Sequence, residues 1–120
     1  MSTRSRGDAA EEKALAMLEA EGLICLERQF RIRIGEIDII MYDPQEAAIV
    51  FVEVRSGDSS RFPAYKESIQ SEKIRKISQV ASVYLDNYRG DYENVRFDAV
   101  FVEKKRVEES VHLQNVAVLT

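Results

Sequence analysis

Two apolar segments, residues 37–42 and 49–54, constrain this chain most strongly, because each carries an acidic residue where a half-buried strand would hold an aliphatic one. Asp38 stands in the first segment and Glu53 in the second, with Arg55 two residues beyond Glu53. Burying a carboxylate inside a hydrophobic strand is costly unless the charge is paired or binds a metal ion. The two acids therefore indicate a functional site on a β-hairpin.

The spacing of the two acids predicts that they face each other. A chain reversal centred on residues 45–46 would place Asp38 directly opposite Glu53 in an antiparallel pair, with Cβ atoms about 4.5–5.5 Å apart. Arg55 would share that face, since strand side chains alternate with a period of two. A register slip of one residue would send Asp38 to the other face of the sheet.

The composition is typical of an ordinary globular domain. Of 120 residues, 45% are hydrophobic and 32% are charged, which argues against disorder. No apolar run approaches the roughly 20 residues of a membrane span, and the chain starts on polar and charged residues rather than on a secretory leader. We therefore expect one cytoplasmic domain over residues 1–120, flexible at residues 1–6, with no membrane partner. The lone Cys25 rules out an internal disulfide and is expected to be buried.

The net charge of −4 and the pI near 5.1 argue against binding nucleic acid by bulk positive charge. Local recognition stays open, because the cations cluster. Each cluster is most simply a solvated face, and only convergence on the acidic site would give it a functional meaning. The three clusters are Arg28, Arg31 and Arg33; Lys73, Arg75 and Lys76; and Lys104, Lys105 and Arg106.

Hydrophobic periodicity predicts an α/β domain with a central mixed sheet covered by helices. The predicted helices span residues 8–21 and 68–86, and residues 56–63 are predicted to form a loop beside the acidic site. The segment 49–54 is nearly all apolar and β-branched, so its strand is expected to be central. Strands are expected at residues 23–26 and 30–34, as one strand or two, and at 37–42, 49–54, 95–102 and 111–118.

Oxygen ligands dominate the candidate chemistry. Glu11 falls on the apolar stripe of the first predicted helix, either as a third acid facing the core or as a side chain snorkelling near the helix N-terminus. Hard oxygen ligands from Asp38, Glu53 and Glu11 would select Mg²⁺ or Mn²⁺, which most often serve phosphate chemistry. The usual zinc ligands and a phosphate-binding glycine pattern are lacking. His112, the only histidine, is expected to be structural.

These parts suggest a phosphodiesterase mechanism. A divalent ion held by Asp38, Glu53 and a neighbouring backbone carbonyl would lower the pKa of a bound water and neutralise charge building on a phosphodiester. A cation at position 55 would orient the nucleophile or stabilise the pentacovalent state. The alternative is a structural salt bridge between Glu53 and Arg55 along a sheet edge.

Five motifs in succession resemble a known family. They are Glu11-x-x-Ala14, Gly35-Glu36-Ile37-Asp38-Ile39-Ile40, Phe51-Val52-Glu53-Val54-Arg55, Lys73 and Arg96-Phe97-Asp98. The succession is similar to the YraN family of small bacterial proteins, whose restriction-endonuclease-like fold is akin to that of archaeal Holliday junction resolvases. The resemblance implies a PD-(D/E)XK nuclease core in which Glu11, Asp38 and Glu53 are the acidic positions and Arg55 occupies the lysine position. It also implies DNA as partner, branched or junction DNA included, and pairing of two copies into a homodimer.

The chain departs from that family at the basic position. Members usually carry lysine followed two residues later by arginine, whereas this chain has Arg55 and Gly57. Arginine stays protonated, which argues against a general base at Arg55 but not against transition-state stabilisation. Alternatively, Lys66 or Lys73 reaches the site from the following loop and helix. Three classes compete: a metal-dependent nuclease, a nucleic-acid-binding relative that has lost turnover, and a protein-interaction module whose acids are structural.

Overall fold

The computed structural model describes residues 6–119, except for the side chains of residues 6–8, 71 and 72. The stretch expected to be flexible, residues 1–6, lies outside this range apart from its last residue. Five strands form one sheet in the order β1-β2-β3-β4-β5, in which β3 and β4 are parallel and the other neighbours antiparallel. The strands are β1 (Ile24–Ile32), β2 (Gly35–Asp43), β3 (Ala48–Gly57), β4 (Asn94–Glu103) and β5 (Val111–Ala117).

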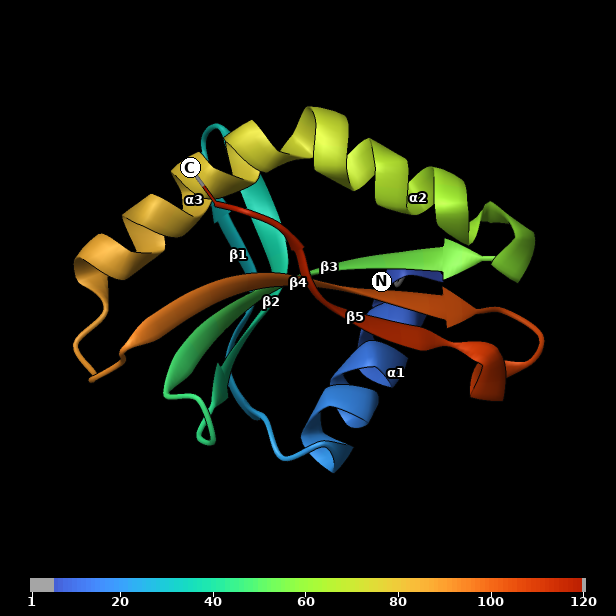
Figure 1. Ribbon diagram of the computed structural model, residues 1–120, viewed down its shortest axis with the longest axis horizontal. Helices are drawn as coiled ribbons and strands as arrows, with labels where there is room; N and C mark the ends of the chain where they lie inside the picture. The colour runs from blue at the N-terminus through green and yellow to red at the C-terminus, as the bar shows by residue number, and fades with distance from the viewer. Residues whose placement is uncertain (1–5, 120) are drawn as a thin grey trace, which may run out of the picture.

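Helices cover both faces of this sheet, as the sequence predicts. Helix α1 (Arg6–Ala20) lies on one face, and α2 (Phe62–Ser68) and α3 (Ile74–Asn87) lie on the other (Figure 1). The parallel pairing of β3 with β4 requires a crossover, which α2 and α3 supply. This α/β architecture is compatible with a restriction-endonuclease-like core. No helix in the described part of the chain is long and apolar enough to cross a membrane.

Strand alternation divides the apolar side chains between two cores. From β3, Ile49 and Phe51 pack toward α3, whereas Val50 and Val52 pack toward α1. Residues 48–53 are all buried, so β3 is the central strand that its near-continuous apolar sequence predicts. Its position in the middle of the sheet holds the segment that carries Glu53 rigidly between two layers of helix.

The prediction of a loop at residues 56–63 was wrong. Strand β3 continues to Gly57, and a 3₁₀ turn at Ser59–Arg61 leads directly into α2. Asp58 caps that turn, because its Oδ1 accepts a hydrogen bond of 2.9 Å from the backbone N–H of Ser60. Pro63 then stands in the first turn of α2, where its missing N–H would have had no helical partner. The segment is therefore the end of β3 followed by a capped 3₁₀ turn and the start of α2, not a loop.

Strand β1 is a single strand with two irregularities, where the sequence left one strand or two open. Its pairing with β2 shifts between Cys25 and Glu27, and Gln29 has a left-handed backbone with φ of 52°. Cys25 is half-buried rather than fully buried, and this burial raises the pKa of its thiol. The left-handed residue breaks the alternation of side chains, which lets neighbouring residues of β1 turn toward α1.

A buried polar network joins β4 to β5 and α1. Asp98 is fully buried and accepts hydrogen bonds from Nε of Arg96 at 3.1 Å and from the backbone N–H of Asn115 at 3.1 Å. His112 places Nε2 2.7 Å from Asp98 Oδ2 and Nδ1 2.7 Å from Glu21 Oε1. Burial favours neutral imidazole, but the hydrogen bonds with the two carboxylates outweigh it and raise the pKa of His112 above 6.5. His112 thus ties the end of α1 to β5.

Candidate active site

The hairpin register brings the two strand acids together. In the β2–β3 ladder Ile39 pairs with Val52, and continuing that register sets Asp38 beside Glu53, which confirms the predicted pairing. The ladder itself ends at Ile39 and Val52. Beyond it, Oδ2 of Asp38 accepts a hydrogen bond of 2.8 Å from the backbone N–H of Val54. The Asp38 side chain thus accepts the hydrogen bond that a neighbouring strand would otherwise accept. This bond fixes the Asp38 carboxylate beside β3.

Asp38 lies in an environment that disfavours a second negative charge. Burial and the nearby Glu53 carboxylate raise the pKa of Asp38 from 3.8 to about 7, against the opposing hydrogen bond from Val54 N–H, and Glu11 adds a smaller repulsion. Carboxylates that repel one another in this way are stabilised by a shared cation. The oxygen donors of the pair fit a hard divalent ion such as Mg²⁺ or Mn²⁺.

Two cations converge on one oxygen of Glu53. This carboxylate is buried, and its Oε2 lies 3.0 Å from Nε of Arg55 and 3.2 Å from Nζ of Lys73. Arg55 approaches along its own strand, as the period-two alternation predicts. Lys73 approaches from the helices that cover this face of the sheet. Of the two lysines considered from sequence, Lys66 and Lys73, it is the one that reaches the acids. Lys66 is exposed on α2 and forms no ion pair with any residue in the described part of the chain.

Lys73 ends a π-helical turn, Ile69–Lys73, that joins α2 to α3. Such turns are rare and often occur at functional sites. The ammonium group remains half exposed, with 49% of the side-chain surface accessible, compared with 24% for Arg55. Lys73 is therefore the cation of the two that a bound phosphate could meet most directly.

Arg55 is held in place by an aromatic ring that sequence reasoning missed. Its guanidinium carbon lies 6.0 Å from the centroid of the Tyr65 ring, and that of Arg61 lies 5.9 Å from the same ring. The Tyr65 hydroxyl donates a hydrogen bond of 3.0 Å to the backbone carbonyl of Ser56. Tyr65 was missed because the helix was expected to begin at residue 68. The signal was present in the spacing of Phe62 and Tyr65, one helical turn apart.

Glu11 is buried on α1 but is engaged by β1. Its Oε1 accepts a hydrogen bond from Arg28 Nε at 3.1 Å and its Oε2 from Gln29 Nε2 at 3.4 Å. Of the two readings of Glu11 left open by the sequence, the core-facing one is confirmed. Within residues 6–119 as described, no three acidic, histidine or cysteine side chains are grouped to hold one metal ion. The predicted three-acid ligand set is thus not assembled, and Asp38 with Glu53 is the pair that remains.

A cavity of about 130 Å³ opens beside Glu53 and Lys73. Lys76 of α3 adds a second ammonium to its lining, and Val80 closes it from the apolar side. Gly35 allows this close packing, because a Cβ there would lie 3.3 Å from a methyl group of Val80. Members of the second basic cluster therefore do converge on the acidic site. Elsewhere the first cluster contributes ion pairs to Glu11, Glu12 and Glu36.

Fold and site together define an α/β protein that carries two neighbouring carboxylates where the pairing of β2 with β3 ends, in a mixed sheet compatible with a restriction-endonuclease-like core. The family model described as "Uncharacterised protein family UPF0102" matches residues 10–102. The chain belongs to this family, which confirms the resemblance to YraN proteins.

Relatives in this family are similar over almost their full lengths. The UPF0102 protein NE0719 of Nitrosomonas europaea is 38% identical over 95% of this chain and 94% of its own length. UPF0102 proteins of Persephonella marina and Mycolicibacterium vanbaalenii are 39% and 34% identical, each over 92% of this chain and 90% and 92% of their own lengths. The likeness to these relatives therefore extends over nearly the whole chain rather than over a short motif.

Proposed function

We propose that this protein is a metal-dependent nuclease of the PD-(D/E)XK type that hydrolyses DNA phosphodiesters, branched DNA included. The observation that carries the proposal is the position of Asp38 near Glu53 where the β2–β3 pairing ends, with Arg55 and Lys73 both on Glu53 Oε2. Paired acids with an adjacent cation are the parts that phosphodiester hydrolysis needs. A DNA substrate would place the protein in the bacterial cytoplasm.

Asp38 and Glu53 would hold Mg²⁺ or Mn²⁺. One oxygen of each, Oδ2 of Asp38 and Oε2 of Glu53, is engaged by Val54 N–H or by the two cations. The other oxygens, Oδ1 and Oε1, make no hydrogen bond to residues that the structure describes, so each carboxylate keeps a hard donor for an ion. When bound, such an ion acidifies coordinated water and offsets the charge that builds on the phosphoryl oxygens.

The two basic residues have different chemical capacities. Arg55 stays protonated and is oriented by the Tyr65 ring, so it supplies fixed positive charge to a developing phosphorane. Lys73 carries a compact, half-exposed ammonium that can bind a phosphoryl oxygen or hold the attacking water. In this proposal Lys73 takes the place that a strand lysine occupies in family members, and Arg55 supports it.

One observation favours a second candidate, a nucleic-acid-binding relative without turnover. Arg55 and Lys73 already place two positive charges on Glu53, beside Asp38. The site therefore approaches neutrality through protein side chains alone, which weakens the attraction for a divalent ion. Under this alternative the same four residues stabilise the fold and contact DNA without cleaving it.

A cleavage assay on plasmid, single-stranded and four-way-junction DNA, with Mg²⁺, Mn²⁺ or EDTA, tests the proposal. We expect metal-dependent cleavage that Asp38→Asn reduces at least about 100-fold, on the scale of lost catalytic electrostatics. Lys73→Ala should reduce it by about 10²–10³-fold, whereas the matched control Lys66→Ala, an exposed lysine outside the site, should leave it unchanged.

Two results would decide for the second candidate. The first is DNA binding with no cleavage of any substrate by the wild-type protein. The second is cleavage that appears only after Arg55→Lys, which would mark the natural protein as a degenerate nuclease. Thermal melting with Mn²⁺ gives an independent readout, since ion binding should raise the melting temperature of the wild type but not of Asp38→Asn.

A further inference from the structure

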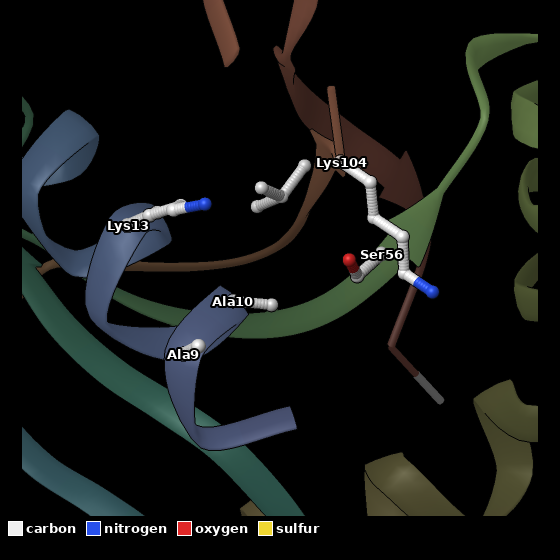
Figure 2. Close-up of a pocket in the computed structure, with 6 residues that line it drawn as sticks. Ala9, Ala10, Lys13, Ser56 and Lys104 are labelled. Atoms are coloured by element: carbon white, nitrogen blue, oxygen red, sulfur yellow. The ribbon is translucent and has the colours of Figure 1, made fainter. Parts of the chain in front are cut away.

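A second and larger cavity lies on the opposite face of the sheet from Glu53. Its volume is about 340 Å³, and its lining comes from three parts of the fold: α1, the end of β3 and the end of β4. In Figure 2, Lys13 projects from α1 on one side of the cavity, and Ser56 and Lys104 stand on the other. The remaining lining side chains are small or apolar and are Ala9, Ala10 and Val102.

The two charged side chains that the structure describes in this lining are both cations. Lys13 and Lys104 are exposed, and neither forms an ion pair with a residue in the described part of the chain. Among the side chains that the structure describes, the lining contains no carboxylate. The nearby Glu103 is buried, and its oxygens are occupied by backbone N–H groups of Ser59, Lys105 and Arg106. Two uncompensated ammonium groups with a hydroxyl between apolar walls suit a phosphate group and its attached sugar.

The cavity adjoins the acidic site through the chain itself. Ser56 directly follows Arg55 on β3, and Ala10 directly precedes Glu11 on α1. Successive Cα atoms are about 3.8 Å apart, and successive strand side chains point to opposite faces. The end of β3 lies between α2 on one side and α1 on the other (Figure 1). The cavity and the acids therefore flank the same strand end.

We propose that this cavity binds a backbone phosphate of a nucleic-acid strand, next to the phosphodiester that lies at Glu53 and Lys73. The inference rests on the proposed function and adds a substrate-binding subsite to it. Lysines act as point charges without base recognition, so the contact is independent of DNA sequence. Lysines on both sides of one strand end, Lys13 and Lys104 on one face and Lys73 on the other, would let a chain of net charge −4 contact DNA locally.

Fluorescence anisotropy with a labelled DNA junction, in EDTA so that no cleavage occurs, tests the subsite. The double variant Lys13→Gln/Lys104→Gln should bind about 10–100-fold more weakly at low salt. Its plot of log K against log salt should be shallower by about 2, because each lysine on a phosphate contributes about 0.9 to the slope. The control Lys66→Gln/Lys105→Gln makes the same charge change at exposed lysines outside the cavity and should keep most of the affinity and slope.

Equal loss of affinity in the two double variants would overturn the subsite, since net charge alone would then explain it. Unchanged binding by Lys13→Gln/Lys104→Gln would overturn it as well, and so would a wild-type protein that binds no DNA. If inorganic phosphate raises the melting temperature of the wild type alone while DNA binding is unaffected, the cavity takes free phosphate and the strand assignment fails. The two proposals can also be told apart. If only the cavity variant loses DNA binding, and the wild-type protein cleaves no DNA with Mg²⁺ or Mn²⁺, the subsite is supported and the nuclease activity is refuted.

Discussion

Replacing Asp38 with asparagine is expected to stabilise the folded protein at pH 8 while leaving its stability at pH 4 almost unchanged. The pKa of this carboxyl is raised from 3.8 to about 7 in the folded state. A group that binds its proton more tightly when folded makes the folded state lose stability as the pH rises from about 4 to about 7. Above that window the folded protein carries the full penalty of the charged carboxylate.

The size of the penalty follows from the pKa difference. At about 1.4 kcal/mol for each tenfold change in proton affinity, the rise from 3.8 to about 7 corresponds to about 4 kcal/mol at most. Water reaching this half-buried group lowers the figure, so we expect a gain of about 2–4 kcal/mol. Asparagine keeps an oxygen for the Val54 N–H, so the change removes charge without removing the hydrogen bond. For a domain of this size the melting temperature should rise by about 10 °C.

Thermal and urea unfolding in EDTA, at pH 4 and pH 8, would measure this effect. Circular dichroism is the suitable probe, because the chain contains no tryptophan. Asp43→Asn, on the same strand, is a matched control that should change the stability in the opposite direction. Asp43 Oδ2 accepts a hydrogen bond of 2.8 Å from Arg96, and although burial opposes it, this pairing lowers the pKa of Asp43. Its stabilisation is present above pH about 4 and is lost as the pH falls, so Asp43→Asn should destabilise the protein at pH 8.

The reasoning about the acidic pair would be refuted by either of two results. One is a melting temperature of Asp38→Asn at pH 8 that equals or falls below the wild-type value. The other is an equal gain at pH 4 and pH 8, which would show that the asparagine improves packing rather than relieving charge repulsion.

Three further predictions concern packing and charge. A Cβ at Gly57 would collide with the Tyr65 hydroxyl, so Gly57→Ala should lower the free energy of unfolding, measured by urea titration, by about 1–3 kcal/mol, and Tyr65→Phe should restore part of it. His112, whose pKa is raised, stabilises the fold fully below pH about 6.5, so the stability loss in His112→Gln should shrink as the pH rises toward 9. Arg28→Ala leaves buried Glu11 without its ion pair and should lower the melting temperature, whereas Arg28→Lys should lower it less.

The hairpin and its acids could be predicted from sequence because local rules determine them. Alternation with a period of two and a turn centred on residues 45–46 fix which side chains share a face, so Asp38, Glu53 and Arg55 were placed together correctly. Amphipathic spacing likewise put Glu11 on the buried side of α1. These inferences need only the geometry of one strand or one helix.

The remaining parts of the site depend on contacts between distant elements. The reach of Lys73 depends on how the crossover helices pass over β3, which no local pattern specifies. The cavity at Lys13 and Lys104 joins residues from opposite ends of the chain. Segment 56–63 was misread because Ser, Asp and Pro are frequent in loops and in helix caps alike, and only the tertiary position of Asp58 and Pro63 separates the two.

The π-helical turn makes the contact between Lys73 and Glu53 sensitive to chain length as well as to side-chain identity. Ile69 and Ile77 are both buried, four residues before and after the lysine, so one sheet-facing side of the helix carries all three. Removing a single residue within the turn would rotate everything beyond it by about 100°, the angle per residue in an α-helix. Either Ile69, or Lys73 together with Ile77, would then turn away from the sheet. A one-residue change in the length of this turn therefore alters whether Lys73 can reach Glu53, even when both side chains are kept.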